Sequence, residues 1–121
     1  MEIIIKSYKD LIVWQKSMVL VFAIYKITDK LPTEERYGLV SQMRRSAVSI
    51  PSNIAEGKMR GTRKDYRHFL LNAFGSGAEL ETLIEISKHL YSSRGLNCLE
   101  IDSLLEEIMK MLSVLIKKLN T

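Results

Sequence analysis

The stretch MRRSAVSIPSNIAEG, residues 43–57, decides how this chain folds, because a proline stands in the middle of a helical pattern. Its apolar positions advance by four, three, four and three residues, which is the spacing of one face of an α-helix. These positions are Met43, Ala47, Ile50, Ile54 and Gly57. The helical phase continues through Pro51, so the stretch predicts a bent helix rather than a loop that carries chemistry.

Pro51 predicts a kink in this helix. A proline inside a helix has no N–H to donate, and its ring clashes with the carbonyl of the residue four positions earlier, at a cost of about 3 kcal/mol. We therefore expect the bend between Ala47 and Pro51. A polar stripe beside the apolar one has short side chains that can bond the carbonyls freed by the bend. The stripe comprises Gln42, Ser46, Ser49, Asn53 and Glu56, and the predicted kink motif is Ser49, Pro51, Asn53, Glu56 and Gly57.

The chain before this stretch predicts a first helix that ends near Thr28. Ser7 and Asp10 resemble a capping box at its start. One apolar face is formed by Leu11, Trp14, Met18, Phe22 and Tyr25, and a second by Val13, Leu20, Val21 and Ile24. Two apolar faces exceed what a single core needs, so we expect a contact beyond the monomer to cover one of them. Residues 1–6 are expected to form a short N-terminal arm that packs on a neighbouring subunit.

Capping signals mark the other helices. Thr33 is expected to cap the second helix, with Glu34 and Glu35 in its first turn, where the helix dipole favours acids.

Thr62 and Asp65 predict the start of a third helix over about residues 63–91. Its small residues at 75–78 favour close approach of a neighbouring helix over a phosphate-binding loop, because such a loop follows a strand. After a polar turn, apolar residues at Leu104, Ile108, Met111, Leu115 and Leu119 predict a fourth helix.

Together these features predict an all-α fold, an antiparallel four-helix bundle in a single domain of residues 1–121. The composition agrees with this, because 6 glycines and 2 prolines in 121 residues favour long regular elements.

The lone Cys98 excludes an internal disulfide, and we expect it to be a packed thiol rather than a nucleophile. We find no signal peptide and no apolar run long enough to span a membrane, so we expect a cytoplasmic protein.

The residues for catalysis or metal binding are scarce. A nucleophile needs a base within reach, yet the only histidines are His68 and His89, both on the predicted third helix. A di-metal carboxylate bundle needs two Glu-x-x-His pairs, and the nearest pattern, Asp65 to His68, occurs once. We therefore expect neither enzymatic activity nor a metal or other cofactor.

Positive charge is concentrated in one part of the chain. The net charge is +4 overall, but residues 36–67 hold eight basic side chains against Glu56 and Asp65. Residues 58–67 form the predicted tip between the second and third helices, and Tyr66 is their only aromatic residue, which argues against base stacking. A solvated turn and a phosphate-binding surface both fit this pattern, and a ring of subunits would strengthen the second. The candidate nucleic-acid-binding residues are Arg44, Arg45, Lys58, Arg60, Arg63, Lys64 and Arg67.

Arg44 and Arg45 are consecutive on a helix and therefore point about 100° apart. At most one of them can face the same binding surface or neighbouring helix. One of them is expected to pair with an acid such as Glu79 or Glu81, on a neighbouring helix or subunit. Nucleic-acid contact is the alternative role for these two arginines.

Three blocks of the sequence resemble one family. GLVSQMRRSAVSIPSNIAEG at 38–57, SYKDLIVWQKSM at 7–18 and NAFGSGAELETLIEI at 72–86 are similar to the four-helix-bundle proteins encoded by intervening sequences in bacterial 23S rRNA genes. The chain departs from the pattern of this family at Ser46, where alanine is commoner, and the change is small. The resemblance implies a homopentameric ring without enzymatic activity.

The accessory proteins of diversity-generating retroelements look like distant relatives of this design. In them a basic barrel contacts nucleic acid and a reverse transcriptase. The expected function is therefore a homo-oligomeric bundle that binds RNA or DNA, or a nucleoprotein or reverse-transcriptase-type partner. The alternative is a protein-interaction scaffold with no nucleic-acid role.

Overall fold

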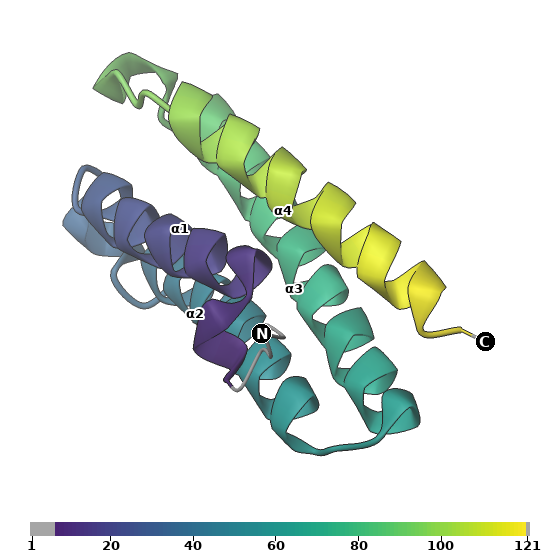
Figure 1. The fold of residues 1–121 in the computed structure, drawn as a ribbon. Coiled ribbons are helices and arrows are strands. Elements are labelled where there is room, and N and C mark those ends of the chain that lie inside the picture. The colour runs from purple at the N-terminus through teal and green to yellow at the C-terminus, as the bar shows by residue number, and fades with distance from the viewer. Residues whose placement is uncertain (1–6, 121) are drawn as a thin grey trace.

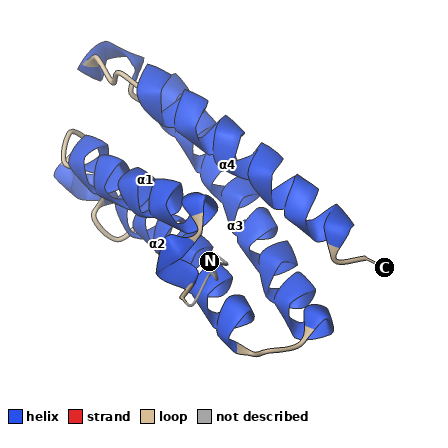
Figure 2. Ribbon diagram, viewed as in Figure 1, coloured by secondary structure: helices blue, strands red, loops and turns tan. Residues whose placement is uncertain are grey.

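The computed structural model describes residues 7–120 as helices joined by short loops (Figure 1). The four α-helices are α1 (Ile12–Thr28), α2 (Leu39–Met59), α3 (Arg63–Leu90) and α4 (Leu99–Lys118). Short 3-10 helices occur at Tyr8–Asp10, Thr33–Glu35 and Ser92–Arg94. The described residues contain no strand, which confirms the all-α prediction (Figure 2). The predicted N-terminal arm, residues 1–6, lies outside the described residues.

The helices close into a bundle in cyclic order. α2 packs along α3, α3 against α4, and α1 against both α2 and α4. Successive helices run in opposite directions, so the α2–α3 loop lies at the same end of the molecule as the C-terminal end of α4 (Figure 1). This topology brings the basic tip of the sequence next to the last turn of α4.

The core contains the apolar stripe that runs through Pro51. All of its members are buried, with Ala47, Ile50 and Ile54 at 0% exposure. Large side chains from the other helices complete the core: Leu20, Ile24, Leu70, Leu80, Ile84, Leu105, Ile108 and Leu112. The continuous helix α2, rather than a loop, is therefore confirmed for residues 43–57.

The polar stripe of α2 has two roles. The Ser46 hydroxyl donates to the carbonyl of Met43, and the Asn53 amide donates to the carbonyl of Ser49 at 2.8 Å. The Ser49 hydroxyl also shares a 2.8 Å hydrogen bond with the Ser76 hydroxyl on α3. The stripe thus satisfies backbone carbonyls and joins two helices. α2 continues past Asn53 without a break, to Met59.

Two predicted helix starts are corrected. Ser7 accepts a hydrogen bond from Lys9 N–H and caps the first 3-10 turn, while Leu11 is the residue before α1. Thr33 begins a 3-10 turn rather than α2. The reason is a break at Gly38, with φ −110° and ψ −112°, after which a Glu35 carboxylate oxygen accepts from the N–H of Leu39 at 3.2 Å. The Thr62 start of α3 is confirmed by a 3.1 Å bond from Asp65 N–H to its hydroxyl.

The structure also decides which apolar faces form the core. On α1 the second predicted face is buried, whereas Phe22 is 64% exposed. On α4 the buried stripe shares Ile108 with the predicted one and consists of Ile101, Leu105, Ile108, Leu112 and Ile116. The small residues of α3 have close neighbours from two helices: the Ser76 hydroxyl meets Ser49 of α2 at 2.8 Å, and a Cβ added at Gly77 would lie 2.3 Å from the sulfur of Met109 on α4.

Candidate nucleic-acid interface

The basic tip is the α2–α3 loop together with the helix ends beside it. Gly61 has a φ of +87°, a left-handed conformation that suits glycine and lets the chain reverse. Thr62 then caps α3 through its hydroxyl. The tight turn places Lys58 and Arg60, at the end of α2, near the first turns of α3.

Two arginines of the tip bind the end of α4. Arg63 donates from Nη2 to the carbonyl of Lys118 at 2.9 Å, and Arg67 donates from Nε to the carbonyl of Ile116 at 3.3 Å. The last carbonyls of a helix lack helical partners and form the negative end of its dipole. These contacts hold both guanidinium groups against the last turn of α4.

Lys58 and Arg60 cover aromatic rings. The Lys58 ammonium lies 5.4 Å from the ring centroid of Tyr66, and the Arg60 guanidinium lies 5.0 Å from that of Phe69. Arg60 also forms an ion pair of 2.8 Å with Glu56. This hydrogen bond and the charge of Glu56 raise the pKa of the Arg60 guanidinium. Part of the charge of Arg60 is therefore offset by the Glu56 carboxylate.

Two shallow depressions meet at the tip. One, of about 500 Å³, is lined by Arg63, Lys64, Arg67, His68, Leu71, Leu119 and Asn120. The other, of about 300 Å³, is lined by Lys58, Gly61, Thr62, Arg63, Tyr66 and Leu119. They share Arg63 and Leu119, so we call them together the basic groove. Its cationic lining is Lys58, Arg63, Lys64 and Arg67.

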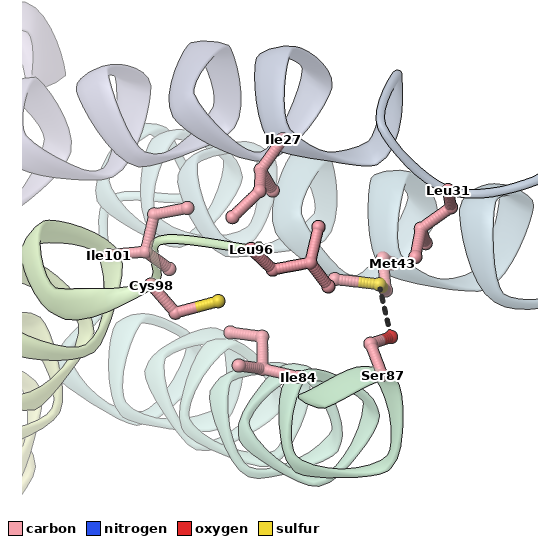
Figure 3. A pocket seen from close by; sticks show the side chains of 8 residues that line it. All are labelled: Ile27, Leu31, Met43, Ile84, Ser87, Leu96, Cys98 and Ile101. Atoms are coloured by element: carbon pink, nitrogen blue, oxygen red, sulfur yellow. Dashed lines mark hydrogen bonds between the residues drawn. The ribbon is translucent and has the colours of Figure 1, made fainter. Parts of the chain in front are cut away.

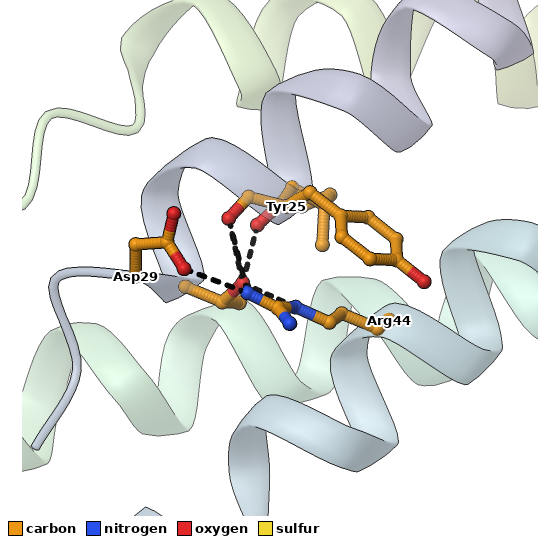
Figure 4. Close-up of polar contacts among 5 residues, drawn as sticks. Tyr25, Asp29 and Arg44 are labelled. Carbon is orange, nitrogen blue, oxygen red and sulfur yellow. Dashed lines mark hydrogen bonds and ion pairs between the residues drawn. The ribbon is translucent and has the colours of Figure 1, made fainter. Parts of the chain in front are cut away.

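Arg44 lies apart from the tip and holds the end of α1 (Figure 4). Its Nε donates to the Thr28 hydroxyl at 2.9 Å, and its Nη2 forms an ion pair of 2.9 Å with Asp29. The expected pairing of one of the two arginines with an acid of a neighbouring helix is confirmed for Arg44, but the acid is Asp29 at the end of α1 rather than Glu79 or Glu81. Arg45, the next residue, is exposed on α2.

Sequence reasoning missed the contribution of α4 to this surface. The carbonyls of Ile116 and Lys118, and the side chains of Leu119 and Asn120, come from the far end of the chain. The predicted antiparallel order did imply that the fourth helix ends beside the start of the third, if the two helices pack together. The sequence alone did not show that they do.

The interior offers no comparable site near Cys98 (Figure 3). A cavity of about 10 Å³, the size of a single water, is lined there by Ile27, Leu31, Met43, Ile84, Ser87, Leu96, Cys98 and Ile101. The Ser87 hydroxyl points to the Met43 sulfur and donates to the carbonyl of Leu83 at 2.9 Å. Burial raises the pKa of the Cys98 thiol. The packed thiol that the sequence predicts is confirmed, since Cys98 is 8% exposed.

Neither a metal cluster nor a membrane helix is found in the part of the chain that the structure describes. Among residues 7–120, no three His, Cys, Asp or Glu side chains come together in a way that could hold a metal ion. No helix within the same range is both long and apolar enough to cross a bilayer.

The fold and the tip together define a small all-α protein, a four-helix bundle with a basic end. The chain belongs to the family of 23S rRNA-intervening sequence proteins, whose family model matches residues 9–114. This confirms the family that the three sequence blocks resemble.

A solved structure supports the fold. It is a protein of unknown function from the S23 ribosomal protein family of Bacteroides thetaiotaomicron, with a TM-score of 0.69 and 22% identity. The match covers 91% of this chain and 100% of that one. A comparison with curated proteins finds no match.

Proposed function

We propose that this protein is a non-enzymatic, homo-oligomeric bundle that binds the phosphate backbone of RNA or DNA, free or in a nucleoprotein, through the basic groove. The observation that carries the proposal is the anchoring of Arg63 and Arg67 on carbonyl oxygens of α4. Side chains held in place before binding lose less conformational entropy when a ligand arrives. Lys58 and Lys64 extend the same positive surface.

The predicted site residues contribute unequally to this proposal. Arg44 and Arg60 are paired with Asp29 and Glu56, so part of their charge is already offset. Phosphate binding releases condensed counterions in proportion to the number of cationic contacts. We therefore assign the main role to the four cations that line the basic groove, with Arg60 at its edge.

An oligomer would repeat this groove around a symmetry axis. The support in the structure is an apolar surface on α1, where Ile12, Val19 and Phe22 are each more than half exposed. Beside it lies a depression of about 340 Å³, lined by Tyr8, Trp14, Met18, Val21, Val48, Pro51, Ser52 and Ala55. Several exposed large apolar side chains on one helix are what a subunit interface would cover. We propose a pentamer because the resemblance to the family implies it.

We also propose that Pro51 bends α2 and so sets the direction of the tip. Pro51 has no N–H for the carbonyl of Ala47, and positions of this kind account for many of the helix kinks sharper than about 20°. Residual dipolar couplings can measure the angle between residues 39–47 and 52–59. The bend should shrink in Pro51→Ala, and two collinear halves in the natural protein would contradict the proposal.

The binding proposal is tested by charge reversal with a matched control. Lys58→Glu/Lys64→Glu changes the groove, whereas Lys26→Glu/Lys30→Glu makes the same charge change near the opposite end of the bundle, beside the start of α4. Anisotropy with labelled RNA and DNA should show binding that weakens about 100-fold between about 50 and 200 mM salt, as four phosphate contacts predict. The groove variant should bind more weakly with a smaller salt slope, and the control variant should retain the natural slope.

If both variants lost affinity equally, binding would depend on net charge alone, and the basic groove would be refuted as the binding site. A lack of salt-sensitive binding by the natural protein would refute the nucleic-acid proposal altogether. The second candidate function, a protein-interaction scaffold, would then stand on the exposed α1 surface. It predicts that a captured partner, such as a reverse-transcriptase-type protein, stays bound after nuclease treatment.

A further inference from the structure

We infer that the basic groove prefers double-stranded nucleic acid to single strands, an inference that rests on the proposed function. Proteins that bind single strands combine a cationic groove with aromatic side chains on which bases stack. Duplex backbones, whose bases are already stacked and paired, need only the cations and a suitable shape. The question is therefore whether the aromatic rings of the tip are accessible to a base.

The two aromatic rings beside the groove are already covered. Tyr66 and Phe69 pack against the backbone of α2, since a Cβ added at Gly57 would lie 2.7 Å from Phe69 Cβ and 3.3 Å from Tyr66 Cδ1. Lys58 and Arg60 then lie over the rings, at 5.4 Å and 5.0 Å from the centroids. To stack on either ring, a base would first have to displace the cation that lies over it. The displaced cation would then lose its contact with the ring.

His68 is the ring that needs separate consideration. It is exposed and lines the groove, and it meets Phe69 edge-to-face, with centroids 5.5 Å apart and planes at 76°. A single imidazole at the rim gives one stacking position at most. We therefore assign recognition to the point charges of Lys58, Arg63, Lys64 and Arg67, with no aromatic platform for successive bases.

Charge density then decides between the two forms of nucleic acid. A duplex presents a phosphate about every 1.7 Å along its axis, whereas each strand by itself presents one about every 3.4 Å. A surface that recognises charge alone gains more counterion release from the denser polyanion. Its salt slope should be about 0.9 per contact on a duplex and about 0.7 per contact on a single strand.

The experiment compares labelled duplexes with their separated strands, as DNA and as RNA, at equal salt. A length of about 20 base pairs spans many phosphate spacings, so each duplex is long enough to contact all the cations of the groove. The full-length protein should bind each duplex at least about fivefold tighter than its strands, with the steeper salt slope. His68→Ala should leave this ratio unchanged, while Lys58→Glu/Lys64→Glu should weaken duplex binding.

The possible failures are distinguishable. Single strands that bind as tightly as duplexes would overturn the inference and leave the proposed function standing. A selective loss of single-strand binding in His68→Ala would also overturn it, because it would reveal a stacking site. A protein that binds neither form refutes the proposed function and, with it, this inference. A duplex preference for RNA and DNA alike supports charge recognition, and a preference restricted to one of them contradicts it.

Discussion

Arg44 of α2 holds the C-terminal end of α1 through Asp29, with Nη2 and Oδ1 2.9 Å apart. The same guanidinium donates to the Thr28 hydroxyl and to the carbonyl of Tyr25, and lies 4.5 Å from the Tyr25 ring centroid. The last carbonyls of a helix need donors from outside the helix. Arg44 is thus a helix cap supplied by a different helix, and it ties α1 to α2.

The first prediction separates the cap from the ion pair. Arg44→Met keeps the apolar stem and removes the donors, so it should lower the free energy of unfolding by about 1 to 2 kcal/mol. Asp29→Asn should cost at most about 0.5 kcal/mol, because an exposed ion pair contributes little and the Asp29 side chain is 78% exposed. Urea denaturation of both variants measures the difference. Equal losses would show that the ion pair, rather than the capping, is what stabilises the contact.

The second prediction concerns two glycines in helices. Gly57→Ala should destabilise the protein by about 1 to 3 kcal/mol, because its Cβ would meet fixed atoms of α3. These atoms are Phe69 Cβ at 2.7 Å and the carbonyl oxygen of Tyr66 at 3.2 Å. Gly75→Ala is the control, since nothing lies within 4 Å of its added Cβ. It should stabilise the protein by about 0.5 to 1 kcal/mol through helix propensity. Thermal unfolding should move in opposite directions for the two variants, and a shared sign would refute the close approach at Gly57.

The third prediction uses Cys98, the single cysteine of the chain. Burial, followed by the charge of Asp102, raises the pKa of its thiol above the ordinary value of 9.0. Because the thiolate is the reactive form, iodoacetamide should modify the folded protein at least about tenfold more slowly than the urea-unfolded chain at the same pH. Similar rates in the two states would contradict the buried position.

The same shift predicts how stability depends on pH. The folded state holds the thiol proton more tightly than the unfolded chain, so the contribution is complete below pH 9.0 and is lost as the pH rises above it. Cys98→Ser removes this titration. The difference in unfolding free energy between the natural protein and this variant should therefore shrink on the alkaline side, and a constant difference would argue against it.

The fourth prediction tests the α1 surface as a subunit contact. Phe22→Glu places a charge where the side chain is 64% exposed in the monomer, so the helix should still fold while the oligomer dissociates. Leu99→Glu is the matched control, at a site that is 80% exposed. Sedimentation velocity should show a smaller species for Phe22→Glu alone, with unchanged circular dichroism. Unchanged sedimentation of Phe22→Glu would remove α1 from the interface.

Local patterns in the sequence were sufficient to predict several elements. The apolar stripe through Pro51 predicted a continuous helix, because a period of three and four residues is a property of one segment. Thr62 and Asp65 predicted the start of α3 for the same reason, since a cap involves residues three apart. Thr33 failed as a start because Gly38 interrupts the backbone that follows it.

The amino-acid sequence by itself determined that this chain forms amphipathic helices and that its positive charge lies around the α2–α3 turn. Only the tertiary structure decided which face of α1 is the core, which acid pairs with Arg44, and which arginines of the tip bind the end of α4. The bond from Arg63 to the carbonyl of Lys118 joins residues 55 positions apart. Such contacts depend on how whole helices pack, and packing is set by the combined burial of many side chains rather than by any local pattern.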